Sequence, residues 1–184
     1  LYTVSAVVGE NKMTRDDKTL AIPLGYDCDK IWGYTSKVDC HKEFAIDTAK
    51  FHKQFSLVNI EFANLIHDFE GLEFYVKSGT AGLDLTDLRP AEGEFSYLLN
   101  LDKNHCGTVC LPRQKQGSRS LVVEILKGGV IIETLPLWSW IEEVGYDWFS
   151  PNLNDINISI DYSISWVTIK VEGWKDSEKK IFII

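Results

Sequence analysis

Four cysteines are the residues of this chain best suited to covalent chemistry. They fall into two local groups, Cys28 with Cys40 at a C-x11-C spacing and Cys106 with Cys110 inside "HCGTVC". An even number of cysteines suggests disulfides, and disulfides would indicate an exported protein. The first spacing suits a bridge between neighbouring strands and the second suits a closed tight loop, with free buried thiols as the alternative. Zinc sites use C-x2-C more often than C-x3-C, so we expect no metal here.

A thiol nucleophile is the one catalytic arrangement that the sequence suggests, because His105 directly precedes Cys106. Adjacent residues on a strand point to opposite faces, so this pair has poor geometry for a base and its nucleophile. The chain also lacks a G-x-S-x-G elbow, an H-E-x-x-H helix, a phosphate-binding glycine loop and a dinucleotide fingerprint. We therefore expect no enzyme activity and no cofactor.

Acidic and amide side chains in two loops have the types that bind calcium. The same types initiate turns, which is the simpler interpretation. These residues are Asp102, Asn104, Asn152, Asn154 and Asp155.

The stretch "PLWSWIEEVGYDW" (136–148) contains three of the six tryptophans and raises the question of a sugar-binding platform. Proline suits a first helical turn, and Leu137, Trp140, Ile141 and Val144 recur on one face of a helix. A C-terminal cap is expected at Gly145. Because this spacing turns Trp138 away from Trp140, the rings do not share a surface, and we predict a short packing helix.

The remaining elements are predicted to be strands. Apolar and polar residues alternate over 55–62, 72–76, 95–101 and 156–171, with a phase change after Trp166 that requires a turn near 161–163 or a bulge. Two β-branched runs flank Gly128-Gly129 within 120–135, the pattern of a hairpin. The sequence therefore predicts an all-β fold with one short helix.

Charge and hydropathy exclude several partner classes. The chain has 184 residues and a formal net charge of −8, with scattered lysines. Nucleic acid and anionic membrane surfaces both need a concentrated positive field, so neither is expected as a partner. No stretch approaches the roughly 20 apolar residues of a membrane span. The chain opens on "LYTVSAVVG" rather than on methionine, consistent with a removed leader or a trimmed end.

Four segments together resemble the fimbrillin-type surface proteins of the Bacteroidales, which include fimbrial tip, anchor and Mfa-like subunits. "DKIWGYTSKVDC" is similar to the end of their first domain, and "FHKQFSLVNIEF" to the strand that opens their second. "LVVEILKGGVIIETLPLWSWI" is similar to their late hairpin, and "LNDINISIDYSISWVTIKVEGW" to their closing strands. Family members are usually longer, and the four cysteines are not part of the pattern.

The resemblance implies a β-sandwich of transthyretin-like topology. It divides the chain into an N-terminal β segment, 1–48, as the remainder of a first β-domain, and a sandwich domain, 49–184. It also implies export as a lipoprotein precursor to the cell surface or fimbrium, in association with the outer membrane. The implied function is a non-catalytic pilin, tip or anchor that binds other fimbrial subunits by strand exchange, and a host protein or glycan as a further partner.

The apolar end "IFII", Ile181, Phe182, Ile183 and Ile184, follows the charged stretch "KDSEKK". An uncovered strand of this kind would aggregate, so it must pair, either inside this chain as an edge strand or as a strand donated to a neighbour. We expect internal pairing in the isolated chain. Two other functions stay open: a carbohydrate- or protein-binding sandwich module, and a small enzyme or toxin-neutralising immunity protein.

Overall fold

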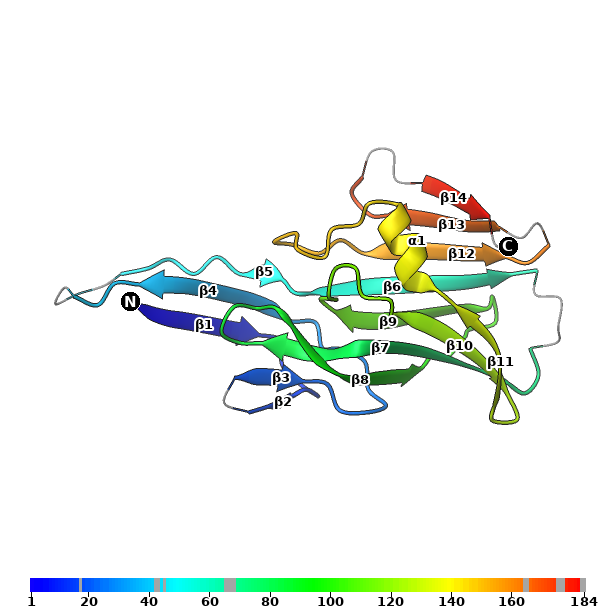
Figure 1. Ribbon diagram of the computed structural model, residues 1–184, viewed down its shortest axis with the longest axis horizontal. Coiled ribbons are helices and arrows are strands. Elements are labelled where there is room, and N and C mark those ends of the chain that lie inside the picture. The colour runs from blue at the N-terminus through cyan, green and yellow to red at the C-terminus, as the bar shows by residue number, and fades with distance from the viewer. Residues whose placement is uncertain are drawn as a thin grey trace.

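The computed structural model describes residues 1–16, 18–41, 44, 46–64, 69–163, 166–174 and 178–182. Strands dominate these residues and pair into three sheets, and one short helix accompanies them (Figure 1). A three-stranded sheet has the order β1 (Tyr2–Val8), β4 (Trp32–Val38) and β5 (His52–Lys53). This sheet extends toward one end of the molecule, at the left of Figure 1.

The other two sheets form the sandwich. The five-stranded sheet has the order β14 (Glu178–Phe182), β13 (Trp166–Val171), β12 (Ile156–Asp161), β6 (Phe55–Ala63) and β9 (Cys106–Pro112). The six-stranded sheet has the order β11 (Val130–Leu135), β10 (Val122–Lys127), β7 (Leu72–Asp84), β3 (Thr19–Ala21) and β2 (Thr14–Arg15), with β8 (Pro90–Leu98) also paired to β7. The all-β sandwich with one short helix is thus confirmed.

The core lies between these two sheets. The ring of Phe62 on β6 packs against Phe74 on β7 with centroids 4.7 Å apart. On the five-stranded sheet, β-branched residues at alternate positions point inward and are fully buried, as the period-2 pattern predicts. They include Val58, Ile60, Val109, Ile156, Ile158, Ile160, Val167, Ile169 and Val171. Most outward positions of the same strands are polar, which suits a sheet that packs on the core with its other face. These residues are Asn59, Glu61, Thr108, Asn157, Ser159, Thr168 and Lys170.

Two turn predictions are confirmed. Gly128 and Gly129 have φ angles of 58° and 78°, and they join β10 to β11 in the left-handed conformation that a tight primed turn requires. The change of phase near Trp166 arises from a turn after Asp161, and β12 and β13 pair antiparallel on either side of it.

The tryptophan stretch forms helix α1 (Leu137–Glu143). Leu137, Trp140 and Ile141 are buried, whereas Trp138 is only partly buried and lies under the guanidinium of Arg119. The N–H of Gly145, at φ 78°, donates to the carbonyl of Glu142 and ends the helix with a left-handed cap. The packing helix is confirmed, and its rings form no common surface.

The boundaries of β7 and β8 differ from those that the sequence predicted. β7 continues past Val76 to Asp84 because Ser78 and Thr80 keep the inward alternation, and the Ser78 hydroxyl is satisfied by a hydrogen bond of 2.5 Å to Gln114 in the core. β8 begins at Pro90 and ends at Leu98, before the end of the stretch 95–101 that the alternation indicated.

The first 48 residues take part in more than one sheet. β1 and β4 pair with each other over seven consecutive residue pairs, and β4 also pairs antiparallel with β5. β2 and β3, by contrast, pair into the six-stranded sheet through β7. Leu20, Ile22 and Ile31 belong to the same hydrophobic core as the sandwich strands.

Candidate functional site

The first strand, β1, offers an accessible pairing edge. It pairs antiparallel with β4 on one side, from Tyr2 opposite Val38 to Val8 opposite Trp32. No residue of β1 is buried. Its outer N–H and C=O groups have no strand beside them in the described sheets, which is the arrangement that accepts an added strand.

One face of the three-stranded sheet is apolar and exposed. Alternate residues of β1 and their partners on β4 share this face. The exposed fraction is 68% for Tyr2, 46% for Val4, 48% for Val8 and 38% for Trp32. Contiguous exposed apolar side chains of this kind mark interaction surfaces more often than scattered ones do.

The opposite face of this sheet is anchored to the sandwich. Thr35 on β4 donates a hydrogen bond of 3.3 Å to the carbonyl of Thr86. The backbone at Gly33 is so close to Leu88 that an added Cβ would lie 2.9 Å from a methyl carbon of that side chain. β4 is therefore held by the sandwich, and β1 is attached through its pairing with β4 and through Val7, which packs against the core.

The β1 edge lacks the features by which proteins protect exposed edges. Its sequence, YTVSAVV, has no charge and no proline, and its pairing with β4 runs without a register shift. The edge strand β11 differs, although Val130, Ile131 and Ile132 are all at least half exposed. Its hairpin has a register shift between Ile125 and Leu126, and β11 includes a glutamate, both of which discourage strand addition.

The C-terminal strand β14 pairs inside the chain. Ile181 lies opposite Val167 of β13, and Phe182 lies opposite Trp166. Ile181 also packs against the core. The expected donor or edge strand thus occupies an edge of the five-stranded sheet at Ile181 and Phe182, and Ile183 and Ile184 lie outside the described residues.

A pocket of about 330 Å³ lies where the three-stranded sheet joins the sandwich. Its lining includes Tyr34, His52, Arg113 and Phe149. Phe149 is 61% exposed, and among the described residues Nδ1 of His52 is buried without a hydrogen-bond partner. An exposed ring beside polar groups is an arrangement that suits a small polar ligand such as a sugar.

Arg113 is the buried cation of this pocket, and it has a structural role. Its guanidinium donates hydrogen bonds to the carbonyls of Trp148 and Ser150 and to the side-chain oxygen of Gln54. Burial lowers the pKa of Arg113 from its usual value. The side chain thus connects the 148–151 loop to Gln54 and to the end of β9.

The four cysteines have free thiols, and their positions do not fit the local pairings expected from spacing. Cys106 and Cys110 lie on the same strand, about 13 Å apart at roughly 3.3 Å per residue, which is too far for a bridge. Cys28 is buried, and Cys40 is exposed beyond the far end of β4. The fold instead places Cys28 beside Cys110.

Among the described residues, the neighbouring His105 is not placed as a base for Cys106. The ring of His105 stacks on Phe69 at 3.6 Å, while the Cys106 thiol faces the carbonyl of Asn104. Burial raises the pKa of Cys106, which disfavours the thiolate that a nucleophile needs. The sequence prediction that this pair has poor catalytic geometry is consistent with these contacts.

Two of the loop carboxylates considered as calcium ligands are used for contacts within the fold. Asp102 accepts the N–H groups of Asn104 and Cys106, a turn-forming contact that lowers its pKa. Asp155 accepts hydrogen bonds from the ammonium group of Lys53 and from the backbone N–H of Leu57. Among the described residues, no group of three or more potential metal ligands is present, and no helix is long and apolar enough to cross a membrane.

Two features of the site were missed by sequence reasoning. The first is the β1 edge, although the uncharged run "YTVSAVV" was a usable signal. The second is the approach of Cys28 to Cys110, for which the sequence holds no local signal because Cys28 lies in the connection between β3 and β4 and Cys110 lies on β9, far along the chain.

Comparison with known proteins shows similarity in structure only. No protein-family model matches the sequence, and no curated protein matches it significantly. A candidate polysaccharide-binding protein of Bacteroides thetaiotaomicron is 11% identical with a TM-score of 0.66, over 100% of this chain and 76% of that chain. The fimbrial anchor protein Mfa2 of Porphyromonas gingivalis is 12% identical with a TM-score of 0.62, over 97% of this chain and 76% of that chain.

A candidate adhesin of Bacteroides thetaiotaomicron is 12% identical with a TM-score of 0.59, over 100% of this chain and 77% of that chain. At these identities the matches establish a shared fold. They confirm the fold expected from the resemblance, which a fimbrial anchor and candidate adhesins of the Bacteroidales share with this chain.

Proposed function

We propose that this chain is a non-catalytic structural subunit of a fimbria or another cell-surface assembly. In this proposal the protein is exported, is associated with the outer membrane, and joins neighbouring subunits by strand addition at β1. The observation that carries the proposal is the edge of β1, which is uncharged, continuous in register and, within the described sheets, unpaired on its outer side. The shared fold with the anchor Mfa2 supports it.

Strand addition at this edge has a clear driving force. A neighbour's strand would satisfy the outer backbone groups of β1, and its alternate side chains would cover the apolar face around Val4 and Trp32. β14 is committed to β13 within this chain, so we assign the accepting edge to β1 and the donated strand to another subunit.

The test compares two variants, one with a lysine on the edge strand β1 and one with a lysine on the edge strand β11. Val4→Lys on β1 should leave the melting temperature of the monomer nearly unchanged, because Val4 is about half exposed. It should also abolish incorporation into surface assemblies, since a lysine on an edge strand prevents pairing with another strand. Incorporation is measured as the ladder of complexes extracted from the surface of cells that express the variant in place of the native chain.

Val130→Lys is the matched control, because Val130 is 66% exposed on the edge strand β11. Assembly should be normal in this variant. If Val130→Lys blocks assembly and Val4→Lys does not, the accepting edge is β11. If both variants assemble normally, strand addition at these edges is excluded.

The pocket beside β5 favours a second candidate function, a carbohydrate-binding module. Phe149 and the unpartnered Nδ1 of His52 are the observations that support it. Phe149→Ala should then abolish binding on a glycan array while the melting temperature stays constant. Equal glycan binding by the variant and the native chain would remove this candidate.

A further inference from the structure

Cys28 and Cys110 are in direct contact although they belong to distant parts of the sequence. Cys28 lies in the connection between β3 and β4, and Cys110 lies in β9 of the five-stranded sheet. The N–H of Cys28 donates a hydrogen bond of 2.9 Å to the carbonyl of Cys110. A direct backbone hydrogen bond keeps two α-carbons within the roughly 4.4–6.8 Å that bridged cysteines span.

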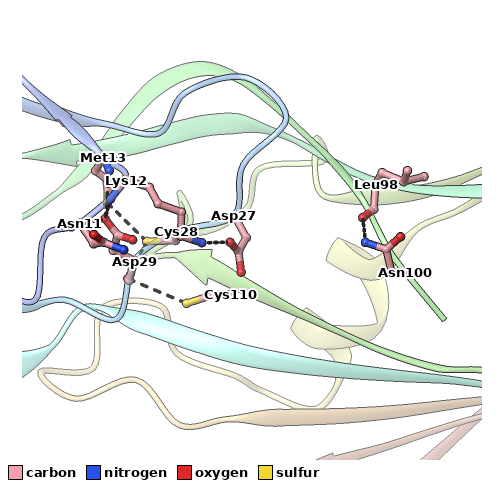
Figure 2. Close-up of polar contacts among 9 residues, drawn as sticks. All are labelled: Asn11, Lys12, Met13, Asp27, Cys28, Asp29, Leu98, Asn100 and Cys110. Atoms are coloured by element: carbon pink, nitrogen blue, oxygen red, sulfur yellow. Dashed lines mark hydrogen bonds and ion pairs between the residues drawn. The ribbon is translucent and has the colours of Figure 1, made fainter. Parts of the chain in front are cut away.

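The two thiols are directed to the same place (Figure 2). The Cys28 sulfur lies 3.2 Å from the carbonyl oxygen of Asp29, and the Cys110 sulfur lies 3.9 Å from that same oxygen. Both residues are buried, with exposed fractions of 2% and 3%. Met13 is the other sulfur neighbour, 3.8 Å from Cys28.

We propose that Cys28 and Cys110 form the disulfide of this protein when the chain meets an oxidising compartment. The bond joins two segments that local spacing does not pair, and it leaves Cys40 and Cys106 as thiols. This inference does not depend on the proposed function.

The oxidant is a disulfide, either of a thiol oxidoreductase or of a small molecule. One cysteine thiolate attacks a sulfur of that disulfide, forms a mixed disulfide and releases one thiolate. The second cysteine thiolate attacks the chain sulfur of the mixed disulfide and releases the other thiolate. Two chain thiols lose two electrons and two protons, and the oxidant becomes two thiols.

The disulfide would fasten the N-terminal segment to the sandwich. Asp29, next to Cys28, already holds residues 11–13 through backbone hydrogen bonds from Asn11, Lys12 and Met13 (Figure 2). A covalent bond from Cys28 to β9 would extend this attachment into the five-stranded sheet. The connection between β1 and β2 would then be linked to both layers of the sandwich.

The folded chain should oxidise slowly. The hydrogen bond with Cys110 is the main cause that raises the pKa of Cys28 well above its usual value, and burial is the second cause. The attacking thiolate is therefore scarce while the core is closed. Formation of the bond should be fast during folding, before the core closes, and slow afterwards.

The test uses the full chain, unfolded in denaturant and reduced, and then refolded with oxidised and reduced glutathione. Free thiols are alkylated, and the protein is digested without reduction for mass spectrometry. We expect the peptide with Cys28 to be linked to the peptide with Cys110, and Cys40 and Cys106 to be alkylated. Linkage of Cys28 to Cys40, or four alkylated cysteines, would overturn the proposal.

Stability gives a second measurement. The double variant Cys40→Ser/Cys106→Ser keeps the proposed pair and changes only side chains outside the core. Its melting temperature should be about 4–16 °C higher when oxidised than after treatment with dithiothreitol. Cys110→Ala should lose this difference. An equal melting temperature in both redox states of the double variant would contradict the proposal.

Discussion

The carboxylate of Asp29 lies 2.9 Å from the backbone nitrogen of Met13, and the same oxygen accepts the N–H groups of Asn11 and Lys12 at 2.7 Å. Asp29 itself is only 4% exposed. One buried charge therefore organises the whole loop between β1 and β2. Because the loop leads directly from the candidate assembly strand into the sandwich, this contact links the proposed function to the stability of the fold.

Asp29→Asn should destabilise the protein by roughly 1–3 kcal/mol at pH 7, since it weakens three charge-assisted bonds at a buried site. Unfolding in urea measures the change. Asp27→Asn is the matched control, because Asp27 contacts the partly exposed Lys12 at 2.6 Å and such pairs contribute little. An equal loss in both variants would contradict the role of Asp29.

The native chain should also lose stability in acid through Asp29. Burial alone would raise the pKa of this carboxyl, but its backbone N–H donors outweigh burial and lower the pKa below the ordinary value. A group with a depressed folded pKa stabilises the fold fully above its unfolded pKa, near 3.9, and this contribution is lost as the pH falls through the folded pKa. Below about pH 4, the unfolding free energy of Asp29→Asn should therefore decline less steeply than that of the native chain.

Trp140 and Trp138 should differ in their contributions to stability. Trp140→Ala removes a ring that is 5% exposed, and it should cost roughly 3–5 kcal/mol, the range for a buried aromatic truncation. Trp138→Ala should cost less because that ring is only partly buried beneath Arg119. Equal losses in chemical unfolding would show that α1 packs in another way.

Deleting residues 181–184 should lower the melting temperature of the monomer, because Ile181 pairs with Val167 and packs against the core. Thermal unfolding of the purified monomer measures this, and extraction of surface assemblies measures incorporation. If the monomer keeps its melting temperature while assembly disappears, the terminal strand is a donor rather than part of the sandwich.

Gly82→Ala should be strongly destabilising, because a Cβ at this position would lie 2.4 Å from the backbone oxygen of Leu20 on β3. The strand β3 would have to move away from β7, at a cost of about 1–3 kcal/mol or more. Gly79→Ala is the control, since its Cβ would meet only the Ser120 side chain, at 3.1 Å. Urea unfolding should show a clearly smaller loss for Gly79→Ala.

The sequence by itself determined the elements whose pattern is local and repeated. Alternation over Ile156, Ile158 and Ile160 identified a strand with one buried face, since side chains on a strand point alternately to opposite faces. The adjacent glycines at 128 and 129 identified the hairpin, because few other residues adopt positive φ angles so readily. The helical spacing from Leu137 to Ile141 identified α1 and its buried ring, Trp140.

Only the tertiary structure decided which strands are neighbours. β6 pairs in parallel with β12, far along the chain, and this pairing follows from how whole sheets pack rather than from either strand's own pattern. The same packing extends β7 through Ser78 to Asp84, places Cys28 against Cys110, and leaves the outer side of β1 without a neighbouring strand in the described part of the chain. An edge and a thiol contact are properties of two segments together, so a pattern read along a single segment does not contain them.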